Sequence, residues 1–208
     1  ILSETGEIIG GEHILASRMK DPCEVAKLYR YAEHYNEQFQ IVGEPLYMDN
    51  LSEGNIRGGL STTEEKSLGC IKKGGISEIK EVVAYAERPG RKGLIFMDTP
   101  GYDAASVAGM VAGGAQIIIF TTGLGSPVGN PVAPVIKMTG NPYTYKNLDD
   151  NIDFDASAVI KGEKTIEEVA DQLFEEMLAV SNGKKTKAEI LGFNQISMAR
   201  LCNFNCSG

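Results

Sequence analysis

Polar residues that could bind a ligand collect directly after two short apolar runs in the centre of the sequence. Asp98 and Asp103 follow the run 94–97, and a polar loop follows the run 116–120. The candidate ligand-binding residues of that loop are Thr121, Thr122, Gly123 and Asn130. Short runs rich in Ile, Phe and Leu are typical of buried strands. If the strands are parallel, these residues share the carboxyl edge of a sheet, where open α/β folds bind ligands.

A second candidate site is His13, which follows Glu12 in a loop broken by glycines. Histidine commonly serves as an acid, a base or a metal ligand, and a loop can present it to a cleft. A surface histidine without a function is the alternative. His34 lies among polar residues of a predicted helix, which indicates a solvated face.

A third candidate is a helix start behind the glycines at 58 and 59. Two pairs fit the capping-box spacing, Ser61 with Glu64 and Thr62 with Glu65. The free amides at such a helix end attract an anion, for example a carboxylate, and Lys66 lies about one turn further on. Capping alone also explains the hydroxyl groups.

The elements expected to position these residues form a βαβ unit. A helix follows the first strand, with Asp103 or Ser106 as its cap, and glycines 113 and 114 end it. Such crossovers are almost always right-handed, so the strands should be parallel. We expect a three-layer, Rossmann-like α/β domain whose sheet contains 94–97, 116–120 and 135–138, preceded by a mostly helical N-terminal segment. The expected domains are 1–90 and 91–208.

Further elements follow from capping signals and apolar spacing. The sequence predicts helices over 22–39, 77–86 and 165–180, the last with a capping box and an apolar face that covers the sheet. That face comprises Ile166, Val169, Leu173, Phe174 and Met177. Residues 1–11 are expected to be extended, 44–59 to form a long loop or lobe boundary, and 183–187 to form a solvated linker. The acidic residues at 149–155 predict a solvated turn around a strand at 152–154, because they lack the pattern of a calcium loop.

Composition excludes several classes of function. The net charge of −8, from 28 acidic and 20 basic residues, argues against nucleic acid or an anionic membrane as a partner. No apolar run reaches the roughly 20 residues of a membrane span. Four cysteines without a CxxC pair are typical of a reduced, cytoplasmic protein, and Cys202 and Cys206 do not indicate a metal site. The glycines at 123, 125 and 129 do not open a helix, so they do not make a dinucleotide fingerprint.

Three segments together resemble one enzyme family. They are SETGEIIGGEH at 3–13, GNIRGGLSTTEEKSLGCIKKGG at 54–75, and the stretch from MDTPGYD to KMTGN at 97–141. These segments resemble the altronate and galactarate dehydratases, a family that also includes the large subunit of sulfolactate sulfo-lyase. The resemblance extends over nearly the whole chain.

The resemblance implies a hydro-lyase that dehydrates a sugar acid to a 2-keto-3-deoxy acid with a divalent metal, Fe²⁺ or Mn²⁺. Dehydration needs a base, a group that holds the developing enolate, and an acid for the leaving hydroxyl. The implied catalytic residues are His13, Glu12 and Lys66, and the implied metal ligands are Glu4, Glu12 and His13. The implied substrate-binding residues are Thr62, Asp98, Asp103, Thr121, Thr122, Gly123 and Asn130. For Asp98 and Asp103, capping of the adjoining turn and helix is the favoured alternative.

The resemblance also implies that the chain is the C-terminal part of a longer enzyme. We therefore expect the upstream part of the same polypeptide as a partner, and a homo-oligomer is compatible with the sequence. Altronate is the favoured substrate, from the likeness of residues 162–200 to altronate-type members, with galactarate and sulfolactate as alternatives. A non-catalytic structural or interaction domain is the alternative of another class. The chain alone is expected to fold but to bind metal weakly and to lack activity.

Overall fold

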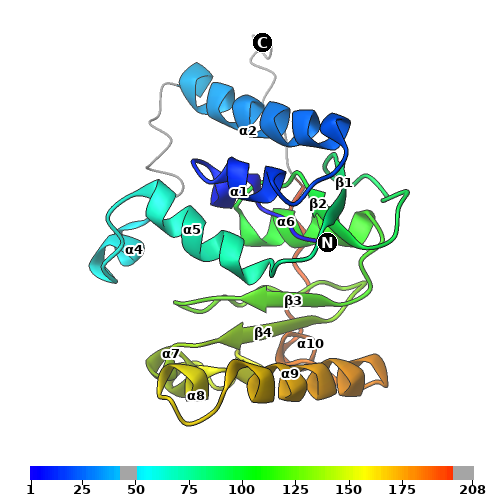
Figure 1. The fold of residues 1–208 in the computed structure, drawn as a ribbon. Helices are drawn as coiled ribbons and strands as arrows, with labels where there is room; N and C mark the ends of the chain where they lie inside the picture. The colour runs from blue at the N-terminus through cyan, green and yellow to red at the C-terminus, as the bar shows by residue number, and fades with distance from the viewer. Residues whose placement is uncertain (43–50, 199–208) are drawn as a thin grey trace, which may run out of the picture. The chain divides into compact units, whose positions relative to one another are not determined.

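The structure is a computed structural model, and it describes residues 1–42 and 51–198. Within that part the chain divides into two compact units, residues 1–114 with residue 198, and residues 115–197. Each unit combines parallel strands with helices (Figure 1). The expected α/β fold with a mostly helical N-terminal segment is confirmed. The division into domains at residue 90 stays a prediction.

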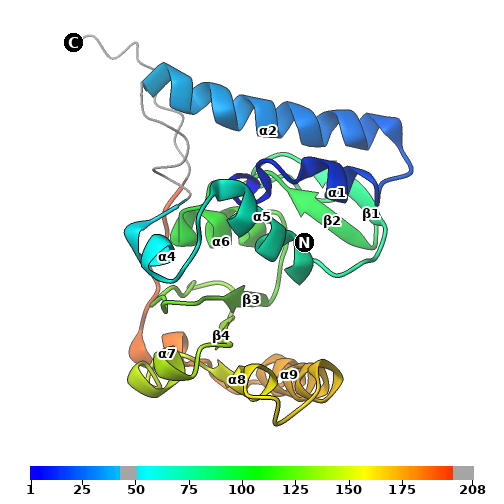
Figure 2. The same cartoon turned by 60° about the vertical axis from the view of Figure 1, so that its left-hand side comes forward.

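In the described residues of the first unit, five helices precede two strands. Its elements are η1 (Thr5–Ile8), α1 (Glu12–Ala16), α2 (Pro22–Val42), α4 (Glu53–Arg57), α5 (Thr63–Lys73), β1 (Ile79–Val83), β2 (Leu94–Met97) and α6 (Asp103–Ala112). Helix α2 packs along β1, η1 and α1 (Figure 2). The core between these elements includes Leu15, Leu28, Val82 and Phe96, all nearly inaccessible to solvent.

Strand β1 is a correction, because the sequence predicted a helix over 77–86. Ile79, Val82 and Val83 are buried, and β1 pairs in parallel with β2. Branched residues such as Ile and Val lose side-chain freedom in a helix and pack well in a strand, so contacts with β2 and α2 override the helical spacing.

The N-terminal segment also differs from the expected extended run. Leu2 forms a parallel bridge with Phe96, in which Leu2 N donates to Ile95 O and Met97 N donates to Leu2 O. The chain then turns into the short 3-10 helix η1. Of the loop expected over 44–59, residues 44–50 lie outside the described part, and α4 forms within the remainder.

Helix α6 lies where the sequence predicts it, but its N-cap residue is a different one. Tyr102 occupies the N-cap position without a side-chain cap bond, and Asp103 is the first helical residue, so the predicted cap by Asp103 or Ser106 is wrong. Gly113 ends the helix as predicted. A Cβ atom at Gly113 would lie 2.4 Å from Met97 Cε, so this glycine lets α6 approach β2 closely.

The second unit contains a separate parallel sheet in the order β3–β4–β5. Its elements are β3 (Ile118–Thr121), β4 (Val135–Thr139), α7 (Pro142–Asn147), β5 (Phe154–Asp155), α8 (Ser157–Ile160), α9 (Ile166–Ser181) and α10 (Lys187–Leu191). The expected single sheet is therefore wrong in one respect: among the described strands, 94–97 pairs with β1 and not with β3. Ile79–Val83, unrecognised in the sequence, supplies the buried partner that β2 requires.

Two features near the end of the second unit differ from expectation. The capping box of Thr165 and Glu168 at α9 is confirmed, but Ile166 and Phe174 are exposed, so the apolar face is only partly covered. The segment expected as a solvated linker instead leads into α10. Its cap, Thr186, is buried and has its own capping box with Glu189.

Candidate functional site

The carboxyl edge of the β1–β2 pair gathers polar residues from three segments of the first unit. Asp98 and Thr99 follow β2, Glu4 and Thr5 follow the Leu2 bridge, and Ser106 comes from the first turns of α6. Thr99 Oγ1 lies 3.1 Å from Ser106 Oγ, and Ser106 Oγ lies 3.2 Å from Ser3 Oγ. Polar groups thus meet at the end of this sheet, but the expectation that Asp98 and Asp103 share one sheet edge with the loop after 116–120 is wrong, because β2 and β3 belong to different sheets.

Glu4 has a strained backbone at this edge. Its φ of 73° and ψ of 82° lie in the left-handed region, which residues other than glycine seldom adopt. Two hydrogen bonds hold it there: Glu4 N donates to Thr99 Oγ1 at 2.8 Å, and Thr5 N donates to Thr99 O at 3.0 Å. Strain of this kind costs about 1–3 kcal/mol and is concentrated at functional sites.

The environment of Glu4 favours its protonated form. Burial and the negative charges of Glu7 and Asp103 raise the pKa of Glu4 from 4.5 to about 7, against the opposing effects of Lys73 and a hydrogen bond with Ser106. A carboxyl group with a pKa near neutrality can both accept and donate a proton at physiological pH. The geometry and the electrostatics thus point to the same residue as a proton-transfer group.

A second acidic residue of η1 is tied to helix α5. Glu7 Oε1 lies 2.7 Å from Lys66 Nζ, and the Cys70 thiol donates to Glu7 Oε2 at 2.6 Å. Burial and the charge of Glu7 raise the pKa of Cys70 to about 12, so the thiol keeps its proton. Lys66 and Cys70 lie one turn apart on α5 and together fix η1, which carries Glu7 and follows Glu4.

Asp98 is partly buried, and its carboxyl group binds a neighbouring hydroxyl group of the chain. Thr5 Oγ1 donates to Asp98 Oδ1 at 2.5 Å, and Asp98 N donates to Val83 O. Burial raises the pKa of Asp98, while the Thr5 hydrogen bond and the charge of His34 oppose the rise. Asp98 therefore joins the end of β2 to η1, and Asp103 acts on Glu4 through its charge.

The residues implied as metal ligands are not grouped as a metal site. His13 is exposed on α1, and Glu12 Oε1 accepts a hydrogen bond from Gly10 N at 3.0 Å. Over the ranges that the structure describes, no three His, Cys, Asp or Glu side chains could hold a metal ion together. Cys202 and Cys206 lie outside those ranges. The described residues do not fit a complete metal site.

Thr62 is the N-cap of α5, and its hydroxyl accepts a hydrogen bond from Glu65 N at 3.1 Å. Ser61 N and Ser61 Oγ both donate to Glu65 Oε2. Capping thus accounts for these hydroxyl groups. Thr62 is nevertheless exposed at the free end of the helix.

The candidate residues after β3 lie in the second unit, where most of them stabilise their own loop. Thr122 Oγ1 accepts from Gly125 N, Gly123 O accepts from Thr144 Oγ1, and Asn130 Oδ1 accepts from the amides of residues 132 and 133. Thr121 and Gly123 are exposed at the end of the strand. These two positions remain open to a ligand.

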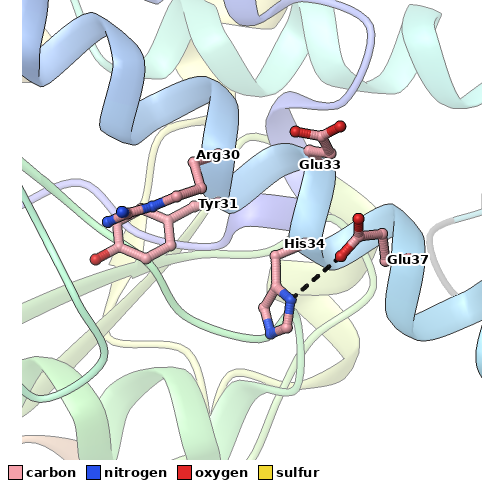
Figure 3. Close-up of a pocket in the computed structure, with 5 residues that line it drawn as sticks. All are labelled: Arg30, Tyr31, Glu33, His34 and Glu37. Carbon is pink, nitrogen blue, oxygen red and sulfur yellow. Dashed lines mark ion pairs between the residues drawn. The ribbon is translucent and has the colours of Figure 1, made fainter.

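A surface pocket of about 340 Å³ on α2 contains none of the residues predicted for the site. It is lined by Arg30, Tyr31, Glu33, His34 and Glu37, and His34 Nδ1 lies 3.7 Å from Glu37 Oε2 (Figure 3). His34 is about half exposed, in agreement with the expected solvated face. All five lining residues come from the single helix α2, away from the strand ends, so we place the candidate site at Glu4.

The sequence reasoning missed Glu7, Cys70 and Thr99. Cys70 had a detectable signal, because it follows Lys66 by four residues on a predicted helix, which places both on one helix face. Glu7 had none, because it lies in a segment predicted to be extended, where positions three residues apart lie on opposite faces. Thr99 had none, because its contact with Glu4 joins residues 95 positions apart.

A parallel α/β unit with a strained, proton-accepting carboxyl group at its strand ends has the features of an enzyme domain. Residues 1–203 match the family model described as D-galactarate/Altronate dehydratase, C-terminal. The chain belongs to this family.

Three relatives illustrate the range of the family. The chain is 36% identical to (2R)-sulfolactate sulfo-lyase subunit beta of Chromohalobacter salexigens, over 97% of the chain and 52% of that protein. It is 32% identical to altronate dehydratase of Escherichia coli, over 95% of the chain and 39% of that protein. It is 37% identical to galactarate dehydratase (L-threo-forming) of Escherichia coli, over 89% of the chain and 35% of that protein. The chain thus spans about half or less of these relatives.

No helix in the described ranges is both long and apolar enough to cross a membrane.

Proposed function

We propose that the chain is the C-terminal part of a hydro-lyase that removes water from a sugar acid, with Glu4 as a proton-transfer residue. The observation that carries this proposal is the Glu4 carboxyl group, held on a strained backbone by Thr99 and kept near a neutral pKa. Membership of the dehydratase family supports the reaction class.

The reaction needs a group of this kind. Dehydration of a 2,3-dihydroxy acid breaks the C2–H bond and the C3–OH bond, releases water, and leaves an enol that becomes the 2-keto acid. In its ionised form Glu4 accepts the C2 proton, and in its protonated form it can return a proton to the product or to the leaving hydroxyl. Ser106, whose hydroxyl bonds to Glu4, orients the carboxyl group.

The remaining predicted residues take supporting roles in the proposal. Lys66 is engaged by Glu7, which suits it to holding η1 better than to serving as the base. His13 and Thr62 are exposed and free to meet a ligand from solvent, as is Thr121 in the other unit. A divalent metal, Fe²⁺ or Mn²⁺, belongs to the proposal for the longer enzyme and would require ligands beyond those grouped in the described residues.

Altronate is the proposed substrate. The preference rests on the likeness of residues 162–200 to altronate-type members, because identities of 32% to 37% across the relatives do not separate the substrates. All three relatives are named for small acids. The second candidate is sulfolactate, supported by the match to the sulfo-lyase over 97% of the chain.

The test uses the full-length protein that carries this chain, loaded with Fe²⁺ or Mn²⁺. The 2-keto acid formed from altronate, galactarate and glucarate is measured, together with sulfite released from sulfolactate. We expect keto acid from altronate and a loss of about 10²–10⁴-fold in kcat for Glu4→Gln, the usual contribution of a general acid or base. Glu33→Gln, an exposed carboxyl on α2, is the matched control and should keep full activity.

Each result separates the alternatives. Sulfite release without keto acid from altronate would replace the proposed substrate by the second candidate. Full activity in Glu4→Gln would remove Glu4 from the chemistry. Absence of turnover with every substrate in the loaded, folded protein would favour a structural or interaction domain.

A further inference from the structure

The second unit contains a buried lysine for which the proposed reaction has no use. Lys137 lies in the middle of β4, the central strand of its sheet, and its side chain is completely inaccessible to solvent. Its Nζ donates to the carbonyl of Val128 at 3.2 Å. A lysine is almost never fully buried without a compensating role, because removing an ammonium group from water costs several kcal/mol.

The groups around Lys137 come from the neighbouring elements. Asp153, just before β5, accepts from Lys137 N at 2.8 Å and from Lys187 N at 2.7 Å. Lys187, at the start of α10, donates its Nζ to the carbonyl of Ile152 at 2.6 Å. Burial lowers the pKa of Lys137, the charge of Lys187 lowers it further, and the charge of Asp153 opposes both effects.

The carbonyl held by Lys137 belongs to the loop 122–130, which carries three of the candidate ligand-binding residues. The same loop is held from a second side, because a Cβ atom at Gly129 would lie 2.1 Å from Phe193 O and 2.9 Å from Ala188 Cβ. Segment 122–134 joins two parallel strands without a helix. Its shape therefore depends on such contacts and not on regular backbone pairing.

We propose that Lys137 is a positioning residue that holds the loop 122–130 in the shape required to receive a small hydroxy carboxylate. Lys137 touches no substrate, and acts through Val128 on Gly123, at the exposed start of the loop, and on Thr121, the last residue of β3. The ligand class rests on the proposed function, whereas the effect of Lys137 on the loop does not.

The first test measures amide hydrogen exchange in the chain and in Lys137→Met, which keeps an unbranched side chain only one atom shorter but removes its donor. We expect the protection of loop amides such as those of Gly125 and Val128 to fall about tenfold, as for a lost hydrogen bond to a charged group. The protection of β3 and β4 amides should stay unchanged. Lys185→Met, which removes an exposed lysine of the same unit, is the matched control and should change neither.

The second test measures kinetics of the full-length Lys137→Met enzyme. A positioning role predicts a KM for the sugar acid raised about tenfold, with kcat within about threefold, because the loop binds ligand without taking part in the chemistry. Where Lys137→Met does not fold, Lys137→Leu, which also lacks the donor, replaces it in both tests.

Loss of protection spread evenly over β3, β4 and the loop would overturn the proposal, since it would make Lys137 a general stabilising residue. Loop-selective loss with an unchanged KM would overturn the assigned ligand role of the loop. An inactive wild-type enzyme would contradict the proposed function, while the exchange result would still decide whether Lys137 positions the loop.

Discussion

Replacing Glu4 by Gln should stabilise the chain, and more so at alkaline than at acidic pH. Glutamine has the shape of a protonated glutamate and can keep the hydrogen bond with Ser106. In the folded chain Glu4 keeps its proton up to about pH 7, whereas in the unfolded chain a glutamate releases it near pH 4.5. The unfolded state thus binds fewer protons between these values, and the stability of the wild-type chain falls as pH rises through that window.

The magnitude follows from the gap between 4.5 and about 7. At about 1.36 kcal/mol per pH unit, this gap corresponds to about 3 kcal/mol, and solvent screening of the partly exposed side chain reduces it to about 2 kcal/mol. Glu4→Gln removes this penalty. The amount by which the free energy of unfolding of Glu4→Gln exceeds that of wild type should therefore be about 2 kcal/mol larger at pH 8 than at pH 4.5.

The assay is denaturant unfolding of the 208-residue chain and its Glu4→Gln variant at the two pH values, with Glu33→Gln as the control. The difference between variant and wild type must change with pH for Glu4 and stay constant for Glu33. An equal effect of Glu4→Gln at both pH values would refute the reasoning, because it would mean that Glu4 is ionised normally in the folded chain.

Three further substitutions test the packing that surrounds the candidate sites. Thr165→Ala removes the capping box of α9 and should lower the free energy of unfolding by about 1 kcal/mol, measured by denaturant titration. Phe96→Ala empties a fully buried position of the first unit and should cost about 3–5 kcal/mol, whereas the same loss at exposed Phe174 should cost far less. Asp153→Ala leaves the amides of Lys137 and Lys187 unpaired and should cost about 2–3 kcal/mol, with amide exchange rising first in α10; unchanged exchange there would contradict the role of Asp153.

Local signals in the sequence were sufficient for much of the secondary structure. Helix α9 and its capping box, the Thr62 cap of α5, and helix α2 after Asp21 are encoded by residues within a few positions of one another. The motifs that carry the family resemblance are local too, and the match over residues 1–203 confirms the family. The argument against nucleic acid as a partner likewise rests on net charge, which follows from the sequence alone.

Local sequence signals could not predict which distant segments pair with one another. The sequence predicts a helix where β1 lies, because the apolar residues of this segment also fit a helical spacing. Pairing with β2 and contact with α2 make the segment a strand instead. The predictions of a cap at Asp103 or Ser106 for α6 and of a solvated linker at 183–187 are wrong for a similar reason. There the deciding contacts, such as that of Asp153 with Lys187, join residues 34 positions apart.

The sequence by itself determined the chemical types present, the family and the polar ends of the strands. It placed Glu4 among the candidates without indicating that its carboxyl group would differ from an ordinary one. Only the tertiary structure brings Thr99 to the backbone of Glu4, the charges of Glu7 and Asp103 to its carboxyl group, and Lys137 beneath Val128. A pKa and a strained backbone depend on burial and on neighbours distant in the chain, and these exist only once the chain has folded.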